Sequence, residues 1–188
     1  MQTRRTKKNF RFHVTRLCFT LPATLGDRGK TPYERLKEPK DLARWLTELG
    51  LSDFSLELSK DDLVMTKRVR EAIQRAGEAL ASGHPFDRKD LDEINAATMV
   101  PPPIPQLAID GRRVIWKATE LRSVLSMISR DFVDLATGPL SAHVKMCANP
   151  ACRGIFVDES RAQNRRWCSM QTCGNQMKKT RIRERLET

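Results

Sequence analysis

Two pairs of cysteines in the last quarter of this 188-residue chain constrain its fold more than any other feature. Cys147 and Cys152 form one pair, and Cys168 and Cys173 the other; four residues lie inside each pair and fifteen separate the pairs. A zinc ion binds four thiolates at the corners of a tetrahedron, about 2.3 Å from each sulfur, and two short cysteine loops that fold together supply this geometry. Four thiolates leave no open coordination position. The spacing therefore predicts one structural Zn²⁺ ion, with two disulfides or an iron–sulfur cluster as the alternatives.

Positive charge is concentrated at the two ends of the sequence. The formal net charge is +11; residues 1–16 hold six basic and no acidic side chains, and residues 147–188 hold nine basic and four acidic ones. Residues 17–146 hold 19 of each sign and are neutral overall. A cationic segment on a metal-fixed scaffold is typical of proteins that bind polyanions, because each neutralised phosphate releases condensed counterions. A basic tail that only aids solubility is the alternative, above all for residues 1–9.

The apolar segments do not have the form of a targeting signal. Residues 10–25 are the most apolar stretch near the N-terminus, but Arg11, His13 and Arg16 interrupt it and no small-residue cleavage site follows. We therefore expect no secretory signal, no contact with a membrane, and a cytoplasmic, nucleoid-associated protein whose thiols stay reduced. We also expect a protein that is not an enzyme, because the sequence has no phosphate loop, dinucleotide fingerprint or nucleophile–base pattern.

Alternating apolar residues predict few strands in the neutral part of the chain before the cysteine pairs, which we call the body. Two such runs, out of phase with one another, lie in residues 10–21 and indicate a strand with a bend near Thr15. Asp110-Gly111 favours a tight reversal, and the short apolar runs at 107–109 and 114–116 flank it. These residues therefore predict a β-hairpin.

Helical spacing of apolar residues, bounded by capping residues, glycine or proline, is the more frequent pattern in the body. It predicts helices over residues 39–50, 59–83 and 121–138, and another that begins after Asp87 and ends before Pro101. We therefore expect an α+β protein. A mixed α/β domain with a few strands and about four helices would occupy residues 1–140, and a small zinc module residues 141–188.

The order of elements around the cysteines predicts a treble clef for this module. Residues 155–157 have strand character, and residues 165–167 would return beside them after a reversal. Residues 174–186 lack proline and are rich in helix formers, so Cys173 would lie at the start of a C-terminal helix. On that helix the basic residues form two rows, and we expect Ile182 and Leu186, between the rows, to anchor it.

The zinc segment resembles a known family. The string Arg165-Arg166-Trp167-Cys168-Ser169-Met170, followed by Cys173-Gly174-Asn175-Gln176, is similar to the CGNR zinc finger, which follows the ABATE domain in bacterial proteins. Upstream, Arg16-Leu17-Cys18, the stretch 24–29 and the stretch 42–46 are similar to the opening strand, loop and first helix of the ABATE domain. The resemblance implies a stress-induced transcription regulator with a treble-clef finger that contacts DNA and an α/β domain that holds a small ligand.

The sequence departs from the family pattern in two places. Gln176 replaces the final arginine of the CGNR tetrad, so one expected cation is missing. After Cys18 the chain continues Phe19-Thr20-Leu21-Pro22-Ala23, where relatives tend to carry an aspartate and an asparagine. If those polar groups bind the family's ligand, this chain has lost or changed it.

We expect the following partners and site residues. Double-stranded DNA is the first partner; RNA, as in translation-associated zinc proteins, and a protein partner of an adaptor are the alternatives, and a second copy of the chain would double the contact area with DNA. The anion-binding candidates for a small ligand are Arg28 and Arg35. The DNA-contact candidates are Arg161, Asn164, Arg165, Arg166, Asn175, Gln176, Lys178, Lys179, Arg181 and Arg183.

Overall fold

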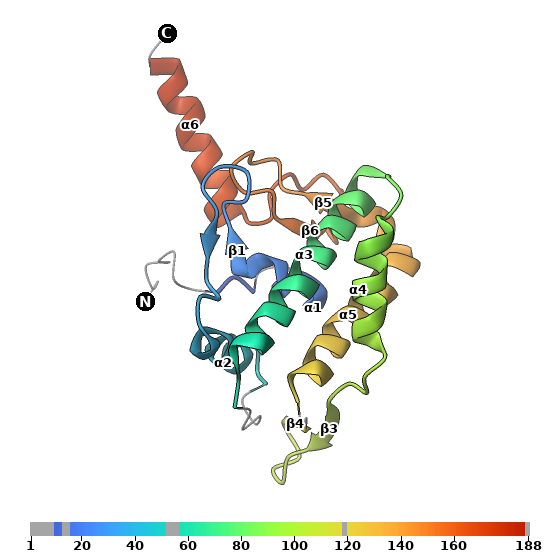
Figure 1. The fold of residues 1–188 in the computed structure, drawn as a ribbon. Coiled ribbons are helices and arrows are strands. Elements are labelled where there is room, and N and C mark those ends of the chain that lie inside the picture. Colours follow the sequence, from blue (N-terminus) through green and yellow to red (C-terminus); the bar gives the residue numbers. More distant parts are fainter. Residues whose placement is uncertain (1–9, 13–15, 52–56, 118–119, 187–188) are drawn as a thin grey trace.

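The structure is α+β, as expected, and helices dominate it (Figure 1). The computed structural model describes residues 10–12, 16–51, 57–117 and 120–186. Its α-helices are α1 (Leu17–Thr20), α2 (Pro39–Glu48), α3 (Lys60–Ser82), α4 (Arg88–Thr98), α5 (Leu121–Thr137) and α6 (Asn175–Leu186). Its strands are β1 (Leu25–Gly26), β2 (Tyr33–Glu34), β3 (Ile104–Leu107), β4 (Val114–Lys117), β5 (Val144–Met146) and β6 (Ile155–Val157). The strands form three antiparallel pairs, β1 with β2, β3 with β4 and β5 with β6.

Capping residues set the ends of the helices that the sequence predicts. Ser59 accepts a hydrogen bond from the Asp62 N–H while the Asp62 carboxylate accepts one from the Ser59 N–H, a reciprocal capping box at the start of α3. Gly83 ends α3 with φ of +66°, a left-handed conformation that glycine adopts without steric strain. Asp87 caps α4 by accepting from the Lys89 N–H. These local signals explain why the four helices are predicted correctly.

The main core is formed where α3, α4 and α5 pack together and α1 and α2 cover them (Figure 1). Phe132 of α5 lies edge-on to Phe19 of α1 and to Phe86 before α4. Trp45, on α2, is fully buried. This core fixes the directions of the helices and the surface on which the C-terminal segment rests.

The strand pair β5–β6 belongs to the same core. Val144, Ile155 and Val157 are buried in it. Gly77 of α3 makes the close approach possible, because a Cβ atom there would lie 2.6 Å from Cδ1 of Ile155. The segment that carries the first cysteine pair is thus packed directly against α3.

The strand expected near the N-terminus is wrong. Residues 17–20 form the one-turn helix α1, a 3₁₀ turn over Pro22–Thr24 follows, and residues 13–15 lie outside the described residues. Cys18, Phe19 and Leu21 are all buried. A short element buried on every side shows no polar face, so its apolar residues alternate only by chance and the period gives no guide to its conformation.

The predicted hairpin around Asp110-Gly111 is confirmed, with a shifted first strand. Its strands pair Leu107 with Val114 and Ile104 with Lys117, so β3 precedes the expected run at 107–109. Gly111 has φ of +64° in the connecting turn. Among the residues that the structure describes, no helix combines the length and the apolar character needed to cross a membrane.

Candidate metal centre and nucleic-acid interface

The four cysteines predicted as zinc ligands converge on one point. Their sulfur atoms all lie within 4.8 Å of one another, and all four residues are buried. The Cys152 and Cys168 sulfurs are 3.6 Å apart, and those of Cys168 and Cys173 are 3.7 Å apart. A regular tetrahedron with zinc–sulfur bonds of 2.3 Å has edges of about 3.8 Å. The four sulfurs therefore fit one structural zinc ion.

The backbone around the first pair prepares the site. Cys147 and Cys152 lie in the tip that joins β5 to β6, closed by a hydrogen bond of 2.8 Å from the Cys147 N–H to the Gly154 carbonyl. The Gly154 N–H points at the Cys152 sulfur, 3.4 Å away. Such N–H contacts stabilise a thiolate and fix its direction. A Cβ at Gly154 would lie 3.2 Å from that sulfur, so the tip leaves little room for a side chain.

The second pair comes from the segment that begins the C-terminal helix. Cys168 follows a stretch without regular secondary structure, and Cys173 lies in a short π-helical turn, Met170–Gly174, that leads into α6. This confirms the expected place of Cys173 at the start of a helix. The extra residue per turn in a π-helix widens the backbone at a functional position.

Crowding among the four thiols shifts their pKa values in opposite directions. Hydrogen bonding, chiefly with Cys152, lowers the pKa of Cys147, whereas hydrogen bonding, chiefly with Cys147, raises the pKa of Cys168. Four such neighbours do not all ionise unless a cation lies between them. Zn²⁺ supplies that charge and would hold all four as thiolates.

The partner of β6 differs from the one predicted. Residues 155–157 pair with β5, which precedes the cysteine loop, and not with residues 165–167. The returning chain is held instead by the buried carboxylate of Asp158. This carboxylate accepts hydrogen bonds from Lys145 (2.7 Å), the Ser160 hydroxyl (2.6 Å) and the Arg165 N–H (2.8 Å). Side-chain hydrogen bonds thus replace a strand ladder on this side of the finger.

Asp158→Asn should destabilise the finger. Burial alone would raise the pKa of Asp158, but the hydrogen bonds from Lys145, Ser160 and Arg165 outweigh it and hold that pKa well below its ordinary value of 3.8. The stabilisation is fully present above about pH 4 and is lost as the pH falls through the lowered pKa. Leaving the Lys145 ammonium without its carboxylate should cost about 2–3 kcal/mol, equally at pH 6 and pH 8, in denaturant unfolding. A loss that grows between these two pH values would contradict this role.

Gln176, which stands at the place of the family arginine, is tied to the cysteine loop. The buried Asn149 accepts a hydrogen bond from the Ala151 N–H through Oδ1 and donates one of 3.0 Å from Nδ2 to Oε1 of Gln176. An arginine has no acceptor atom and could not take this bond. The contact joins the loop of the first cysteine pair to the first turn of α6.

Gln176→Ala should loosen that first turn by about 1 kcal/mol, the usual value of one hydrogen bond. Amide hydrogen exchange in residues 175–180 should then be roughly five times faster. Gln176→Glu keeps an acceptor oxygen and is the matched control. Equal exchange rates in the wild type and Gln176→Ala would show that the bond does not hold the helix.

Most of the predicted DNA-contact side chains lie on an exposed, cationic surface. The helix α6 carries five basic residues and one acidic residue, none of its residues is buried, and it extends away from the body (Figure 1). The expected apolar anchor is wrong: Ile182 is 48% and Leu186 81% exposed. At its start, α6 is tied to the finger by the bond between Gln176 and Asn149 and by Cys173, which lies in the turn that leads into the helix. The exposed candidates are Arg161, Asn164, Arg166, Asn175, Gln176, Lys178, Lys179, Arg181 and Arg183.

Arg165 differs from these candidates because its side chain is engaged within the finger. Its guanidinium donates to the carbonyls of Trp167 (2.9 Å) and Cys168, and lies 4.6 Å from the centre of the Phe156 ring. Arg166, by contrast, is exposed and lies over the Trp167 ring at 5.3 Å. Arg165 therefore stabilises the segment that carries the zinc ligand Cys168, and this role does not require contact with a nucleic acid.

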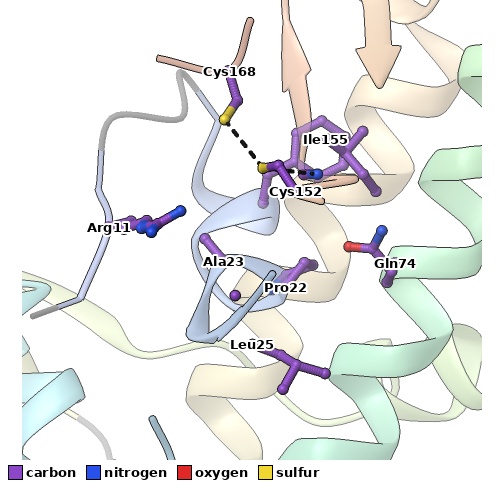
Figure 2. A pocket seen from close by; sticks show the side chains of 11 residues that line it. Arg11, Pro22, Ala23, Leu25, Gln74, Cys152, Ile155 and Cys168 are labelled. Atoms are coloured by element: carbon purple, nitrogen blue, oxygen red, sulfur yellow. Dashed lines mark hydrogen bonds between the residues drawn. The ribbon is translucent and has the colours of Figure 1, made fainter. Parts of the chain in front are cut away.

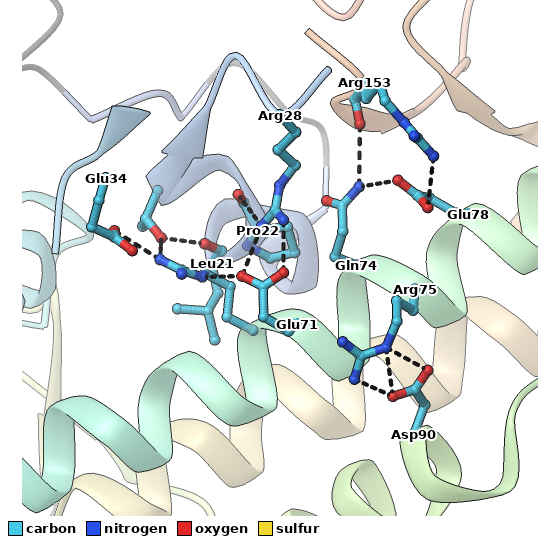
Figure 3. Close-up of polar contacts among 12 residues, drawn as sticks. Leu21, Pro22, Arg28, Glu34, Glu71, Gln74, Arg75, Glu78, Asp90 and Arg153 are labelled. Atoms are coloured by element: carbon cyan, nitrogen blue, oxygen red, sulfur yellow. Dashed lines mark hydrogen bonds and ion pairs between the residues drawn. The ribbon is translucent and has the colours of Figure 1, made fainter. Parts of the chain in front are cut away.

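The finger is joined to the body through the loop of the first cysteine pair. The Gly29 N–H donates to the Ala151 carbonyl (3.1 Å), and a Cβ at Gly29 would lie 1.8 Å from the Pro150 carbonyl oxygen. On α3, Gln74 donates to the Arg153 carbonyl (3.2 Å) and Glu78 pairs with the Arg153 guanidinium (3.2 Å), as Figure 3 shows. No signal in the sequence could have revealed these contacts, since they join residues more than 70 positions apart.

A small hollow lies at this junction, beside Cys152 and Cys168 (Figure 2). Phe19, Pro22 and Ile155 are among the residues that line it, and its volume is about 30 Å³, room for roughly one water molecule. The Gln74 side-chain oxygen borders it and has no hydrogen-bond partner among the described residues. The hollow suits an ordered water and is too small for a metabolite.

The two arginines predicted to bind an anionic ligand make contacts inside the body. Arg28 pairs with Glu71 through two hydrogen bonds of 2.7 and 3.2 Å (Figure 3). Arg35 is 4% exposed and donates to the Thr24 carbonyl (3.3 Å); burial, and then the positive charge of Arg11, lower its pKa. The structure does not bring the two side chains together in one cavity. Arg35 alone lines a groove, beside Tyr33 and Lys37.

Comparisons with known proteins agree with this architecture. Residues 15–139 match the ABATE family, described as "Putative stress-induced transcription regulator", and residues 143–186 match the CGNR zinc finger. No curated protein matches the chain. Because the first match covers more than half of its residues, the chain belongs to the ABATE family, and its four-cysteine centre is that of a CGNR zinc finger.

Proposed function

We propose that this protein is a zinc-dependent DNA-binding regulator whose finger places α6 against the duplex. One observation carries the proposal: a helix with five cations buries none of its residues and extends free of the body from a tetrathiolate centre (Figure 1). Such a helix contributes nothing to the core, so its composition is explained by a partner. Phosphate is the partner that clustered lysines and arginines fit best.

The arrangement of α6 supports both phosphate and base contacts. Lys178, Arg181 and Arg185 lie on one side at 100° per residue, and Lys179 and Arg183 form a neighbouring row. Helical cations in this pattern can bind the two phosphate strands that border a groove. Asn175, exposed at the start of the helix, is of a residue type that can form paired hydrogen bonds with adenine. Its side-chain nitrogen donates to the Gln171 carbonyl at 3.3 Å, a weak bond that duplex contact could replace.

Titrations at several salt concentrations test the proposal. The purified zinc form should bind a 20–25 base-pair duplex with an affinity that falls steeply as salt rises. A plot of the logarithm of the binding constant against the logarithm of the salt concentration should fall with a slope of about four or more, since each neutralised phosphate contributes about 0.9. A folded RNA hairpin and heparin of equal charge serve as competitors. A shallow slope, or tighter binding to the RNA or heparin than to every duplex tested, would overturn the proposal.

A transcription regulator also needs sequence preference and a signal. The family description supports a role in stress responses, which we include in the proposal. Genomic fragments selected by the zinc form should share a motif, and Asn175→Ala should weaken binding to that motif about tenfold while leaving random duplex unchanged. Equal affinity for all fragments would agree with DNA binding but would contradict sequence-specific regulation.

One groove favours a second role, the binding of a small anionic ligand. It is about 470 Å³ in volume, and basic side chains outnumber acidic ones along it; the lining comprises Tyr33, Glu34, Arg35, Lys37, Lys40, Asp41 and Arg44. A screen of nucleotides and sugar phosphates by thermal shift tests this role. A hit should lose its stabilising effect in Lys37→Ala and keep it in Lys89→Ala, whose lysine is exposed on α4. No stabilisation by any anion at millimolar concentration would exclude it.

A further inference from the structure

Two of the four zinc ligands, Cys152 and Cys168, line the small hollow at the junction of the finger and the body (Figure 2). Arg11, Ala23 and Leu25 also line it and are partly exposed, so the hollow reaches the surface on their side. Its volume of about 30 Å³ admits a molecule of roughly one or two non-hydrogen atoms. A very small reactant can therefore reach two thiolates whose residues are otherwise buried.

The hollow also contains a hydrogen-bond acceptor that lacks a donor. Gln74 is 3% exposed, and its side-chain nitrogen donates to the Arg153 carbonyl (3.2 Å) and the Glu78 carboxylate (2.8 Å), which fixes the amide. Its oxygen points toward the hollow (Figure 2) and has no hydrogen-bond partner among the described residues. A buried acceptor without a donor is unfavourable, so the hollow favours an occupant that carries an O–H group.

The rest of the lining selects against ions. Phe19, Leu25 and Ile155 are apolar, and a charged oxidant loses its hydration among such side chains. Hydrogen peroxide is neutral, carries two O–H donors and is little larger than water. It is also an oxidant of thiolates. Among oxidants of cysteine, hydrogen peroxide therefore fits this hollow best.

The two sulfurs that line the hollow differ in the hydrogen bonds that they accept. The Gly154 N–H points at the Cys152 sulfur (3.4 Å), whereas among the described residues the Cys168 sulfur contacts only other sulfurs. An accepted N–H stabilises the negative charge of a thiolate and makes it a weaker nucleophile. Cys168 should therefore react first, and the Cys152 sulfur, 3.6 Å away, is close enough to react second.

We propose that Cys168 and Cys152 form an oxidation site for hydrogen peroxide, which enters the hollow and donates a hydrogen bond to Gln74. The Cys168 thiolate attacks one peroxide oxygen, so that an S–O bond forms, the O–O bond breaks and the other oxygen leaves as hydroxide. The Cys152 thiolate then attacks the sulfur of the Cys168 sulfenic acid, which forms the disulfide and releases a second hydroxide. The two sulfurs lose two electrons to the peroxide, and two protons from solvent convert both hydroxides to water.

The disulfide removes two of the four zinc ligands. Its sulfurs lie about 2.05 Å apart, much closer than the 3.6 Å between them in the zinc geometry, so they no longer occupy two corners of a tetrahedron. Cys147 and Cys173 alone hold the ion weakly. Peroxide therefore releases zinc from the finger, and the start of α6 loses the metal that fixes it.

Zinc release from the zinc-loaded full chain tests this inference, which does not depend on DNA binding. Millimolar hydrogen peroxide should release the ion to a chromogenic chelator. Relative to their rates with free cysteine, it should act at least about tenfold faster than tert-butyl hydroperoxide, because the hollow excludes the extra methyl groups. Alkylation and peptide mapping when half of the zinc is released should find a disulfide between Cys152 and Cys168. The selectivity of free cysteine, or a first disulfide that includes Cys147 or Cys173, would overturn the proposal.

Ala23→Leu fills the hollow and leaves every zinc ligand in place. It should slow zinc release by peroxide about tenfold and leave zinc transfer to the chelator without peroxide unchanged. Ala162→Leu, at an exposed alanine of the finger that does not line the hollow, is the matched control and should react as the wild type does. A zinc-loaded Ala23→Leu protein that reacts at the wild-type rate would overturn the proposal and leave the hollow as the site of a structural water only. If Ala23→Leu does not fold, the selectivity of the wild type between the two peroxides decides.

Discussion

Removal of the zinc ion should abolish DNA binding and destabilise the body as well as the finger. The four sulfurs lie within 4.8 Å of one another, and no apolar cluster of comparable size replaces them among the described residues of the finger: Phe156 and Trp167 are the hydrophobic side chains packed with the cysteines. Binding free energies for structural zinc are about 10–16 kcal/mol, so the finger should unfold without metal. The segment that carries the first pair also supplies core residues to the body.

The expected size of the effect follows from those shared core residues. Val144, Ile155 and Val157 are buried against α3 and lose that packing if β5 and β6 separate. Burial of one such side chain contributes about 1.5–3 kcal/mol, so the body should lose roughly 5 kcal/mol. For a chain of this length that corresponds to a fall in Tm of about 10–20 °C. Calorimetry of the chelated protein, and of Cys168→Ser, measures it.

Cys18→Ala is the control for this experiment. Cys18 is a buried thiol outside the four-cysteine centre, so its removal should leave one zinc per chain and DNA affinity unchanged. Added Zn²⁺ should restore the Tm of the chelated wild type and not that of Cys168→Ser. A chelated protein whose main transition stays within about 2 °C of the zinc form would show that the finger and the body fold independently.

The fold was predictable where its causes are local. Ser59, Asp62 and Gly83 act on the residues beside them, so the bounds of α3 can be inferred from the sequence. The cysteine quartet was predictable because ligand type and spacing alone specify a zinc site. Its place at the start of a helix followed from the absence of proline after Cys173.

The missed features depend on contacts between distant parts of the chain. The bond between Asn149 and Gln176, and the hydrogen bonds of Asp158, form only after the finger has closed. The pairing of β6 with β5 was missed because the two strands enclose the cysteine loop, whereas the sequence favoured the segment that follows. The exposure of Ile182 and Leu186 could not be foreseen, since apolar residues between basic rows usually mark a packed face.

Neutralising the cations of α6 should weaken DNA binding roughly a hundredfold at physiological salt without unfolding the protein. Each lost phosphate contact reduces the slope of log affinity against log salt by about 0.9. Replacing four basic residues should therefore lower this slope by about three to four. Alanine has the highest helix propensity and no residue of α6 is buried, so the helix and the core should persist. The variant replaces Lys178, Lys179, Arg181 and Arg183 by alanine.

A second fourfold variant separates a local site from the effect of net charge. It removes four exposed cations from helices α2 and α4 and from the loop before α2, so the total charge falls equally while α6 stays intact. These cations are Lys37, Lys40, Arg88 and Lys89. The variant in α6 should lose the salt slope and the body variant should keep most of it, because screening at 0.15 M limits the reach of distant charges to about 8 Å. Equal losses in both variants would mean that the duplex senses only the overall charge, and no loss in the α6 variant would remove this helix from the interface.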